Sequence, residues 1–441
     1  APILRRAGAR RRRGHTALGA AVAVASVVLT GALVTDAAGV RPTLGREHPQ
    51  ADREHQLEVV AAALPDTTML GADQVGNLLP GGTWRVASTN DNSVGNGLVL
   101  PCQQERYADP DGTAALIRTF ASTPDKKTSP AMSAIQSTEA SATKRAARTT
   151  YLTSVGWYAG CVDERVQLLA TRRVTGVGDA AMLLALRTWD TPQSTLVVGV
   201  ARTGQVTTTT MTRIGGIDTL PLVRSARMLS AAVDGLCGLP DAGRCAGVPH
   251  SVAVPPLPIG VAPGMLAEVD LPPVRGVSRP WVGTEPQRAR ENVAATRCDD
   301  ADFEAKGITH DLTRSFLIPG ANLPVEFGLT ETVGSMPAKQ AIAFVAAVRS
   351  GLARCPSKNL GTDVTRVSHL QSKSTDLTIW HLTSDITDKM SVRYLMAIVR
   401  SGTAVAQIQF VPSGDVEMAD GAFAALAERA LERLPRLPGP G

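Results

Sequence analysis

The chain has 441 residues, of which 44% are hydrophobic and 19% are charged. This composition is that of a globular protein and excludes a chain that is disordered throughout. The formal net charge is +5, but six arginines within residues 5–13 contribute +6 of it, and the remaining residues sum to about −1. A folded part without excess positive charge does not indicate nucleic-acid binding.

An uncharged apolar run follows the N-terminal arginines. Residues 1–15 are predicted to form a basic cytoplasmic tail and residues 16–35 a transmembrane helix, because about 20 apolar residues span a bilayer. Positive charge before the helix favours a cytoplasmic N-terminus and places the rest of the chain outside the membrane. A cleavable signal peptide is the alternative and would give a secreted protein. Residues 36–63 are polar and are predicted to be a stalk.

Landmarks recur in the same order in the two halves of the remaining chain. Cys102 and Cys161 lie 59 positions apart, and Cys298 and Cys355 lie 57 apart. A tryptophan precedes the first cysteine of each pair by 18 or 17 residues, and an Arg-Thr-Phe or Arg-Ser-Phe tripeptide begins 16 residues after it. A repeat of this length indicates two homologous domains, because each copy is long enough to bury its own core.

The domain boundaries follow from this repeat. The two domains are predicted at residues 64–246 and 263–436. A proline-rich linker at 247–262 joins them, and residues 437–441 form a short tail.

All six cysteines lie after the apolar run, on the side of the membrane where disulfides form. Matching the two copies selects three pairs: Cys102 with Cys161, Cys298 with Cys355, and by elimination Cys237 with Cys245. Reduced, buried thiols are the alternative. Metal ligation is disfavoured because the sequence has no CxxC motif or spaced Cys/His cluster.

Each copy has a helix that leads to its second cysteine. In copy two, Ser335 is expected to cap a helix whose first turn contains Pro337. Apolar residues recur at helical spacing at Ala147, Tyr151, Val155, Tyr158 and Cys161 in copy one, and at Ala341, Val345, Val348, Leu352 and Cys355 in copy two. Both helices are therefore expected to end at the cysteine and to bury it.

Alternating and β-branched runs follow these helices. They cover residues 166–174, 181–189, 195–201 and 205–214 in copy one, and 377–384, 392–399 and 404–411 in copy two. The gaps between them are too short for crossover helices, which indicates antiparallel meanders. Closing helices are predicted at 222–236 and 423–434. The predicted fold class is α+β, with two homologous domains, each an antiparallel sheet with helices packed on one face, preceded by one transmembrane helix.

These features together resemble the PknH-like sensor domain. They are a membrane anchor, an extracytoplasmic unit of roughly 180 residues, a helix-terminal cysteine linked to an earlier one, and the run Gly-Val-Gly-Asp-Ala-Ala at 176–181 ahead of a strand. The family is found in actinobacterial receptor kinases and in secreted or lipid-anchored relatives. The resemblance covers residues 64–246 and 263–436. It implies an α+β domain with a cleft for an envelope ligand and no catalytic residues.

The chain also departs from that family. It carries two copies, has no lipid-attachment cysteine before Cys102 and no visible kinase domain, and has the pair Cys237 and Cys245 in one copy alone.

Three patterns suggest chemistry but have simpler interpretations. The run at 176–181 fits GxGxxA, yet a strand follows it, whereas a dinucleotide site needs a helix there, so a turn is favoured. His48 and His55 lie in the stalk with Pro49 between them, which disfavours a metal pair. The acidic residues Asp299, Asp300, Asp302 and Glu304 lack the alternation and glycine of a calcium loop, so a solvated face is expected.

Arg118 and Arg314 are matching basic residues of the two copies, two positions before a phenylalanine. Each is either an outward-facing strand residue or an arginine that reaches into a cleft for an anionic ligand. We keep both as candidate ligand contacts.

The sequence predicts a non-enzymatic sensor or binding protein, held in the cell membrane by one helix, with its domains outside the membrane. The sequence predicts no catalytic residues, no cofactor-binding residues and no metal ligands. The predicted partner is an envelope ligand, either a small molecule or a cell-wall fragment. A signalling regulator of the anti-sigma type, with a cytoplasmic part upstream of residue 1, and a secreted envelope-binding protein are the main alternatives. An envelope hydrolase without a familiar motif is a third.

Overall fold

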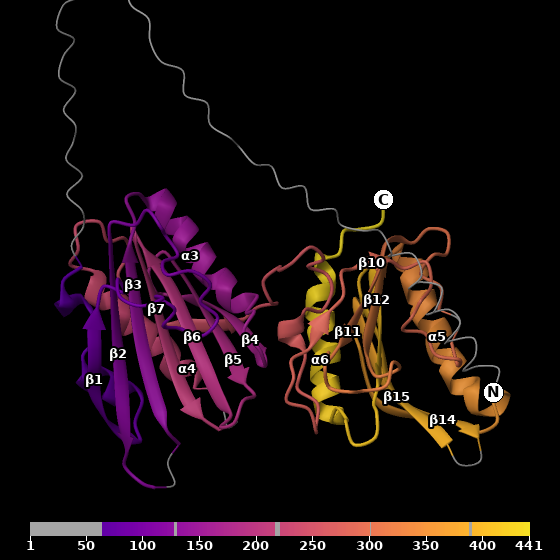
Figure 1. Ribbon diagram of the computed structural model, residues 1–441. Coiled ribbons are helices and arrows are strands. Elements are labelled where there is room, and N and C mark those ends of the chain that lie inside the picture. Colours follow the sequence, from indigo (N-terminus) through magenta and orange to yellow (C-terminus); the bar gives the residue numbers. More distant parts are fainter. Residues whose placement is uncertain (1–63, 128–129, 217–220, 300, 388–389) are drawn as a thin grey trace, which may run out of the picture. The chain divides into compact units, whose positions relative to one another are not determined.

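Two antiparallel β-sheets, one in each sequence copy, form most of the structure. The computed structural model describes residues 64–441 except 128–129, 217–220, 300 and 388–389 (Figure 1). The predicted tail, transmembrane helix and stalk at 1–15, 16–35 and 36–63 lie outside the described residues. Within the described part, none of the helices has the length and apolar character needed to span a bilayer.

The first sheet has the strand order β1-β2-β3-β7-β6-β5-β4-β8. Its strands are β1 (Gly82–Asn90), β2 (Ala114–Pro124), β3 (Met132–Ala140), β4 (Val166–Thr175), β5 (Ala180–Thr188), β6 (Ser194–Thr203), β7 (Val206–Gly215) and β8 (His250–Ala253). The order β7-β6-β5-β4 is the predicted meander. Strand β8 lies in the predicted linker and pairs with β4, so this part of the linker extends the sheet.

The second sheet has the order β10-β11-β12-β16-β15-β14-β13, with β9 paired to β11. Its strands are β9 (Val282–Gly283), β10 (Gln287–Arg288), β11 (Thr309–Leu317), β12 (Gly328–Ser335), β13 (Thr362–Gln371), β14 (Thr375–Thr387), β15 (Met390–Ser401) and β16 (Ala404–Val411). From β11 onward the order is that of β2 onward in the first sheet. The repeat predicted from the cysteine spacing is therefore a repeat of topology.

The helices of the described residues are few. They are α2 (Ala72–Leu78), α3 (Lys144–Ala159) and α4 (Leu222–Leu236) in copy one, and α5 (Ala338–Lys358) and α6 (Asp420–Arg433) in copy two, with 3-10 turns η1 (Asp66–Thr68), η2 (Glu268–Asp270) and η3 (Leu434–Arg436). Two of these α-helices in copy one, α3 and α4, have counterparts at matching places in copy two, α5 and α6. Both α3 and α5 connect the strand at the middle of the sheet to the first strand of the meander. The α+β class is therefore confirmed.

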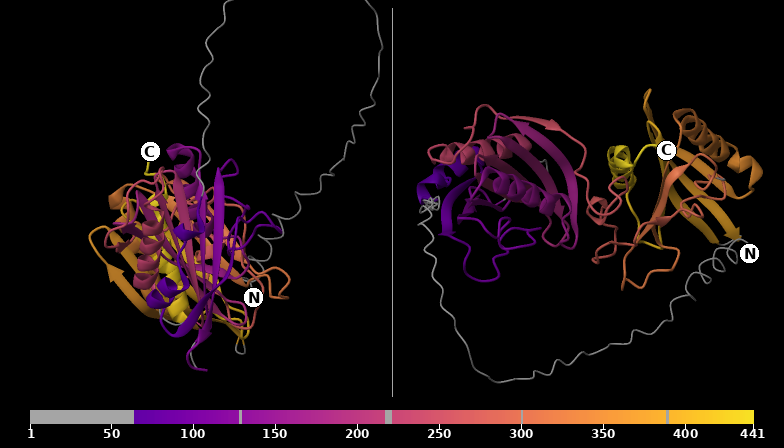
Figure 2. Two further views of the ribbon diagram at one scale, coloured as in Figure 1. Left: turned by 90° about the vertical axis from the view of Figure 1, so that its left-hand side faces the viewer. Right: turned by 90° about the horizontal axis from the view of Figure 1, so that it is seen from above.

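The prediction that helices pack on one face of each sheet is wrong. Side chains alternate along β6, where Val198 and Val200 pack in the cluster of α3, and Val197 and Ala201 pack in the cluster of α4. The helices α3 and α4 thus cover opposite faces (Figure 1, Figure 2). The physical reason is that β6 is apolar from Leu196 to Ala201, and a strand without polar alternation needs cover on both faces.

Copy two repeats this arrangement on β15. Met396 and Ile398 pack in the cluster of α5, whereas Ala397 and Val399 pack in the cluster of α6. The two sheets are therefore each the middle layer of three.

The predicted helical stripes are confirmed, but two details of the helix ends are not. The buried residues of α5 are the five predicted ones, including Cys355. However, α5 continues to Lys358, and α3 ends at Ala159, just before its cysteine. Ser335 does not cap α5, because it is the last residue of β12 and its hydroxyl donates to the carbonyl oxygen of Pro438.

All three predicted disulfides are present. They join Cys102 to Cys161, Cys237 to Cys245, and Cys298 to Cys355. The two long-range bridges tie a loop at the start of each copy to the end of its crossover helix. Each bridge thereby fixes the loop that follows that helix.

We expect the long-range bridges to stabilise the fold more than the local one. Replacing Cys298 and Cys355 together by serine should lower the free energy of unfolding by about 4 kcal/mol, because the bridge closes a long loop in the unfolded chain. Replacing Cys237 and Cys245 should lower it by about 2 to 3 kcal/mol. Urea denaturation of the two double variants measures the difference, and an equal loss in both would contradict the expectation.

Candidate functional site

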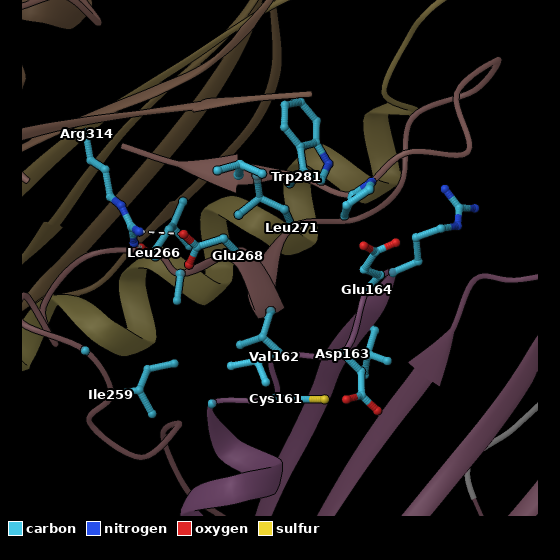
Figure 3. Close-up of a pocket in the computed structure, with 18 of the residues that line it drawn as sticks. Cys161, Val162, Asp163, Glu164, Ile259, Leu266, Glu268, Leu271, Trp281 and Arg314 are labelled. Carbon is cyan, nitrogen blue, oxygen red and sulfur yellow. Dashed lines mark hydrogen bonds and ion pairs between the residues drawn. The ribbon is translucent and has the colours of Figure 1, made fainter. Parts of the chain in front are cut away.

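A cavity of about 680 Å³ opens beside the loop that follows α3. Residues 160–166 of this loop form one wall, parts of the segment 259–286 form the floor and the opposite wall, and Trp189 and Arg314 complete the lining (Figure 3). The wall is held in place by the bridge at Cys161. Asp163 adds a second tie, because it accepts a hydrogen bond of 2.7 Å from the backbone amide of Cys102.

The floor of the cavity is apolar and rigidly packed. Met265, Leu266, Val269 and Leu271 are buried and belong to the cores of the two sheets. Trp281 lines the cavity, and its indole N–H donates to the carbonyl oxygen of Pro272 at 2.8 Å. A floor of this kind is preformed, as is usual for small-molecule sites.

The rim of the cavity leaves apolar side chains in water. Val162, Val261 and Val282 line the cavity with 74%, 82% and 48% of their surface exposed. Covering a valine side chain completely is worth about 1.5 kcal/mol or more, so exposed valines around a concave surface favour the binding of an apolar group.

Charged side chains stand between these valines. Glu268 accepts from Nη2 of Arg314 at 2.6 Å and from the backbone amide of Gly283 at 3.0 Å. Arg165 donates to the carbonyl oxygens of Val277 and Trp189. These ion pairs and hydrogen bonds join the walls, so they shape the cavity as well as lining it.

The candidate ligand contacts Arg118 and Arg314 occupy matching positions with different surroundings. Arg118 does not line the cavity, and its guanidinium donates to the carbonyl oxygens of Met69 and Leu70. Arg314 does line it, while also donating to the carbonyl oxygen of Leu266 at 3.2 Å. Both arginines thus hold a Met-Leu segment at the start of their copy.

The floor segment is tied to the second sheet through buried charges. Arg433 donates two hydrogen bonds to the carboxylate of Asp270, and the Nη2–Oδ1 bond is 2.9 Å long. The two side chains are 1% and 0% exposed. Asp270 also accepts from the backbone amide of Ala267 at 2.8 Å. This bidentate pair fixes the turn η2, from which the floor residues project.

Glu331 supports the same segment from β12. Its Oε2 accepts from the backbone amide of Leu266 at 2.7 Å, and its Oε1 has no hydrogen-bond partner in the described part of the chain. Burial raises the pKa of Glu331 to about 8, although the hydrogen bond from Leu266 acts in the opposite direction. In copy one the matching acceptor is Gln136, which takes a bond of 2.8 Å from the amide of Leu70.

The other predicted patterns are structural. Gly176 and Gly178 have φ of +79° and +59° in a tight turn before β5, which confirms the turn interpretation. The expectation of a solvated acidic face holds for Asp302 and Glu304 but is wrong for Asp299. Asp299 is buried because it accepts from Nε2 of Gln407 and anchors its own loop. Asp300, His48 and His55 lie outside the described residues.

One group in the described part has metal-ligand geometry, but its chemistry does not fit. It consists of Cys102, Cys161 and Asp163. The two sulfur atoms are joined in a disulfide and are not thiolates, so the group cannot supply the ligands that a metal ion requires.

Of the predicted ligand contacts, Arg314 lines the cavity, but the other residues of its lining were not predicted as a site from the sequence. Ile259 and Val261 line the cavity, although they lie in the segment 247–262 that the sequence predicts to be a linker. One usable signal was the recurrence of Met-Leu, at Met69-Leu70 and Met265-Leu266, because it marks the segment that forms the floor in copy two.

The chain has no match among protein-family models or among curated proteins. A match among solved structures is the immunity protein TplEi of the type VI secretion system of Pseudomonas aeruginosa, in complex with an "L" peptide. It is 10% identical, the match covers 71% of this chain and 94% of that protein, and the TM-score is 0.18. At that TM-score the match carries no argument about fold or function.

The buried carboxyl of Glu331 should make stability depend on pH. It stays protonated in the folded chain up to about pH 8, but ionises near its ordinary pKa of 4.5 when the chain unfolds. The folded state therefore binds more protons between these values, and the free energy of unfolding falls as the pH rises from about 4.5 to about 8. Glu331→Gln should remove this fall, because the amide keeps the bond from Leu266 and has no charge.

Urea denaturation at pH 5 and pH 8 tests this expectation. One unit of pKa difference corresponds to about 1.4 kcal/mol, so Glu331→Gln should be more stable than the unmodified chain at pH 8 by at least about 2 kcal/mol. The reciprocal variant Gln136→Glu is the matched control and should gain a pH dependence of the same sign. Parallel profiles for Glu331→Gln and the unmodified chain would contradict the assignment.

Proposed function

We propose that this chain is a non-enzymatic ligand-binding protein of the cell envelope and that its ligand occupies the cavity beside the α3 loop. The exposed valines of the rim, Val162, Val261 and Val282, carry this proposal. An apolar rim over a buried apolar floor is the surface that a ligand with an apolar body would cover. A sensor role, as in the PknH-like domains that the sequence resembles, is the proposed use of this binding.

The charged residues of the lining restrict the chemical classes of ligand that the cavity suits. Glu164, Arg279 and Glu285 line the cavity and are exposed. Because the walls offer both signs of charge, the ligand is proposed to be amphipathic, with a polar group that meets the rim and an apolar part that meets the valines. Four further charged residues of the lining, Asp163, Arg165, Glu268 and Arg314, are held by hydrogen bonds within the protein, and the other lining residues are mainly aliphatic, with two tryptophans.

The proposed location is outside the cell membrane, with the segment 16–35 as the anchor. Three disulfides support an oxidising compartment, since such bridges are rare in the cytoplasm. The alternative of a regulator with a cytoplasmic signalling part concerns residues outside the described part of the chain.

Substitution at the rim should weaken binding of an apolar probe. We expect the fluorescent probe 1-anilinonaphthalene-8-sulfonate to bind the full chain, and Val162→Asp or Val261→Asp to raise its Kd about tenfold, because a carboxylate replaces the apolar contact. Val248→Asp is the control, since Val248 is 89% exposed and does not line the cavity. Equal Kd values in all three variants would place the probe elsewhere and contradict the proposed site.

The redox state of the native protein tests the proposed location. Protein isolated from its own cells in the presence of an alkylating agent should carry no label on its six cysteines before reduction. After reduction, peptide mapping should find label on all of them. Labelling of Cys102 or Cys298 before reduction would show that the domains reside in a reducing compartment.

A further inference from the structure

A second hollow lies in copy one and shares no residue with the cavity described above. It has a volume of about 620 Å³ and is lined by side chains of which all but one are cationic. We call these residues the basic cluster: Lys144, Arg145, Arg148, Asp179, Arg202 and Arg244.

Three separate parts of the fold supply the cations of the basic cluster. Lys144, Arg145 and Arg148 lie in the first turns of α3. Arg202 is near the end of β6, and Arg244 is in the loop after α4 that the bridge between Cys237 and Cys245 closes. Their convergence is therefore a property of the fold and not of one charged stretch of sequence.

Asp179 organises the cluster. Its Oδ2 accepts from Nη1 of Arg202 at 3.1 Å and from the backbone amide of Gly204 at 2.8 Å. Its Oδ1 accepts from the backbone amide of Arg244 at 3.4 Å. This carboxylate is thus engaged by the loops themselves, and it orients Arg202 and the Arg244 loop toward the same hollow.

The remaining cations stand in unfavourable places. Lys144, Arg145, Arg148 and Arg244 are exposed, and no ion pair joins their side chains to another described residue. Cations in the first turn of a helix oppose the helix dipole, and Lys144 and Arg148 are like charges four positions apart. Repulsion of this kind is relieved when an anion binds between the side chains.

Copy two shows that the fold does not need all of these charges. With the buried residues Ala147 and Ala341 aligned, α5 has Ala338, Lys339 and Ile342 where α3 has Lys144, Arg145 and Arg148. Copy two also has no counterpart of the loop bridged by Cys237 and Cys245. The charges and the bridge that closes the Arg244 loop therefore occur together, in the copy that forms the hollow.

We propose that the basic cluster binds a ligand with several phosphate groups. Arginine forks pair with phosphate oxygens. The backbone amides of Lys144 and Arg145, at the start of α3, add further donors for an anion, whereas the amide of Ala146 is capped by Thr143. A single carboxylate would leave most of the four unpaired cations without a counter-charge. The phosphates come either from a soluble polyphosphate or from the head groups of anionic phospholipids, and the experiment below separates these sources.

The experiment uses the full chain and two probes. Titration calorimetry with sodium triphosphate measures binding of a soluble ligand, and co-sedimentation with phosphatidylcholine vesicles, with and without phosphatidylglycerol, measures binding of head groups. Arg145→Gln combined with Arg148→Gln should weaken binding at least about tenfold, and Arg244→Gln should weaken it from a different element of the fold. Higher salt should also weaken it.

Charge-matched controls make the result specific. Arg224→Gln combined with Arg227→Gln removes the same charge from exposed positions of α4, outside the hollow, and should leave binding unchanged. Binding of triphosphate assigns a soluble ligand, and binding that requires phosphatidylglycerol assigns a lipid head group. Absence of both, or an equal loss in the α4 variant, overturns the proposal. Loss at the basic cluster with unchanged binding of the apolar probe would confirm two independent sites.

Discussion

The buried ion pair between Arg433 and Asp270 is the contact on which the cavity depends. Removing two charges from water costs several kcal/mol per ion, so such a pair persists only with near-complete hydrogen bonding. The bidentate contact supplies two of the required hydrogen bonds, and the carboxylate of Asp270 accepts a further one from the backbone amide of Ala267. The carbonyl oxygen of Asp270 also accepts from Gln167 on β4, at 3.2 Å. The turn η2 is thereby fixed to α6 and to β4 at once, and the cavity floor follows from its position.

The parts of the fold that the sequence predicted are those in which local pattern decides the structure. The stripe of α5, from Ala341 to Cys355, and the apolar runs of the meander have the periods of a helix and of strands. The strands β3 and β12, which precede the crossover helices, were missed because polar residues interrupt their apolar ones without a regular alternation, as in MSAIQSTEA. The prediction that the helices cover one face of each sheet was wrong, although the continuous apolar run of β6 indicated that both of its faces are covered.

The candidate site was predicted less well than the fold. The candidate residues were chosen because they match in the two copies, and such a match indicates a structural role more than a functional one. Positions that match in both copies, such as Arg118 and Arg314, hold the start of each copy and so report what the fold requires. Positions at which the copies differ indicate properties that belong to one copy alone. Examples are Gln136 and Glu331, and the cations of α3. The exposure of Val162 or Val261 is a tertiary property, and no spacing of residues in the chain reveals it.

The pair Arg433 and Asp270 also has an evolutionary consequence. Replacing Arg433 leaves Asp270 with only the longer contact to Nε of Arg429, at 3.7 Å, and replacing Asp270 leaves Arg433 buried without its carboxylate partner. Breaking a buried pair in this way destabilises proteins by about 3 to 5 kcal/mol. A substitution at either position is therefore costly unless the other position changes with it. The valines of the rim face water, and their exchange for other side chains leaves the core intact. If the cavity binds the proposed ligand, ligand preference in descendants of this chain is free to diverge while the cavity floor is conserved.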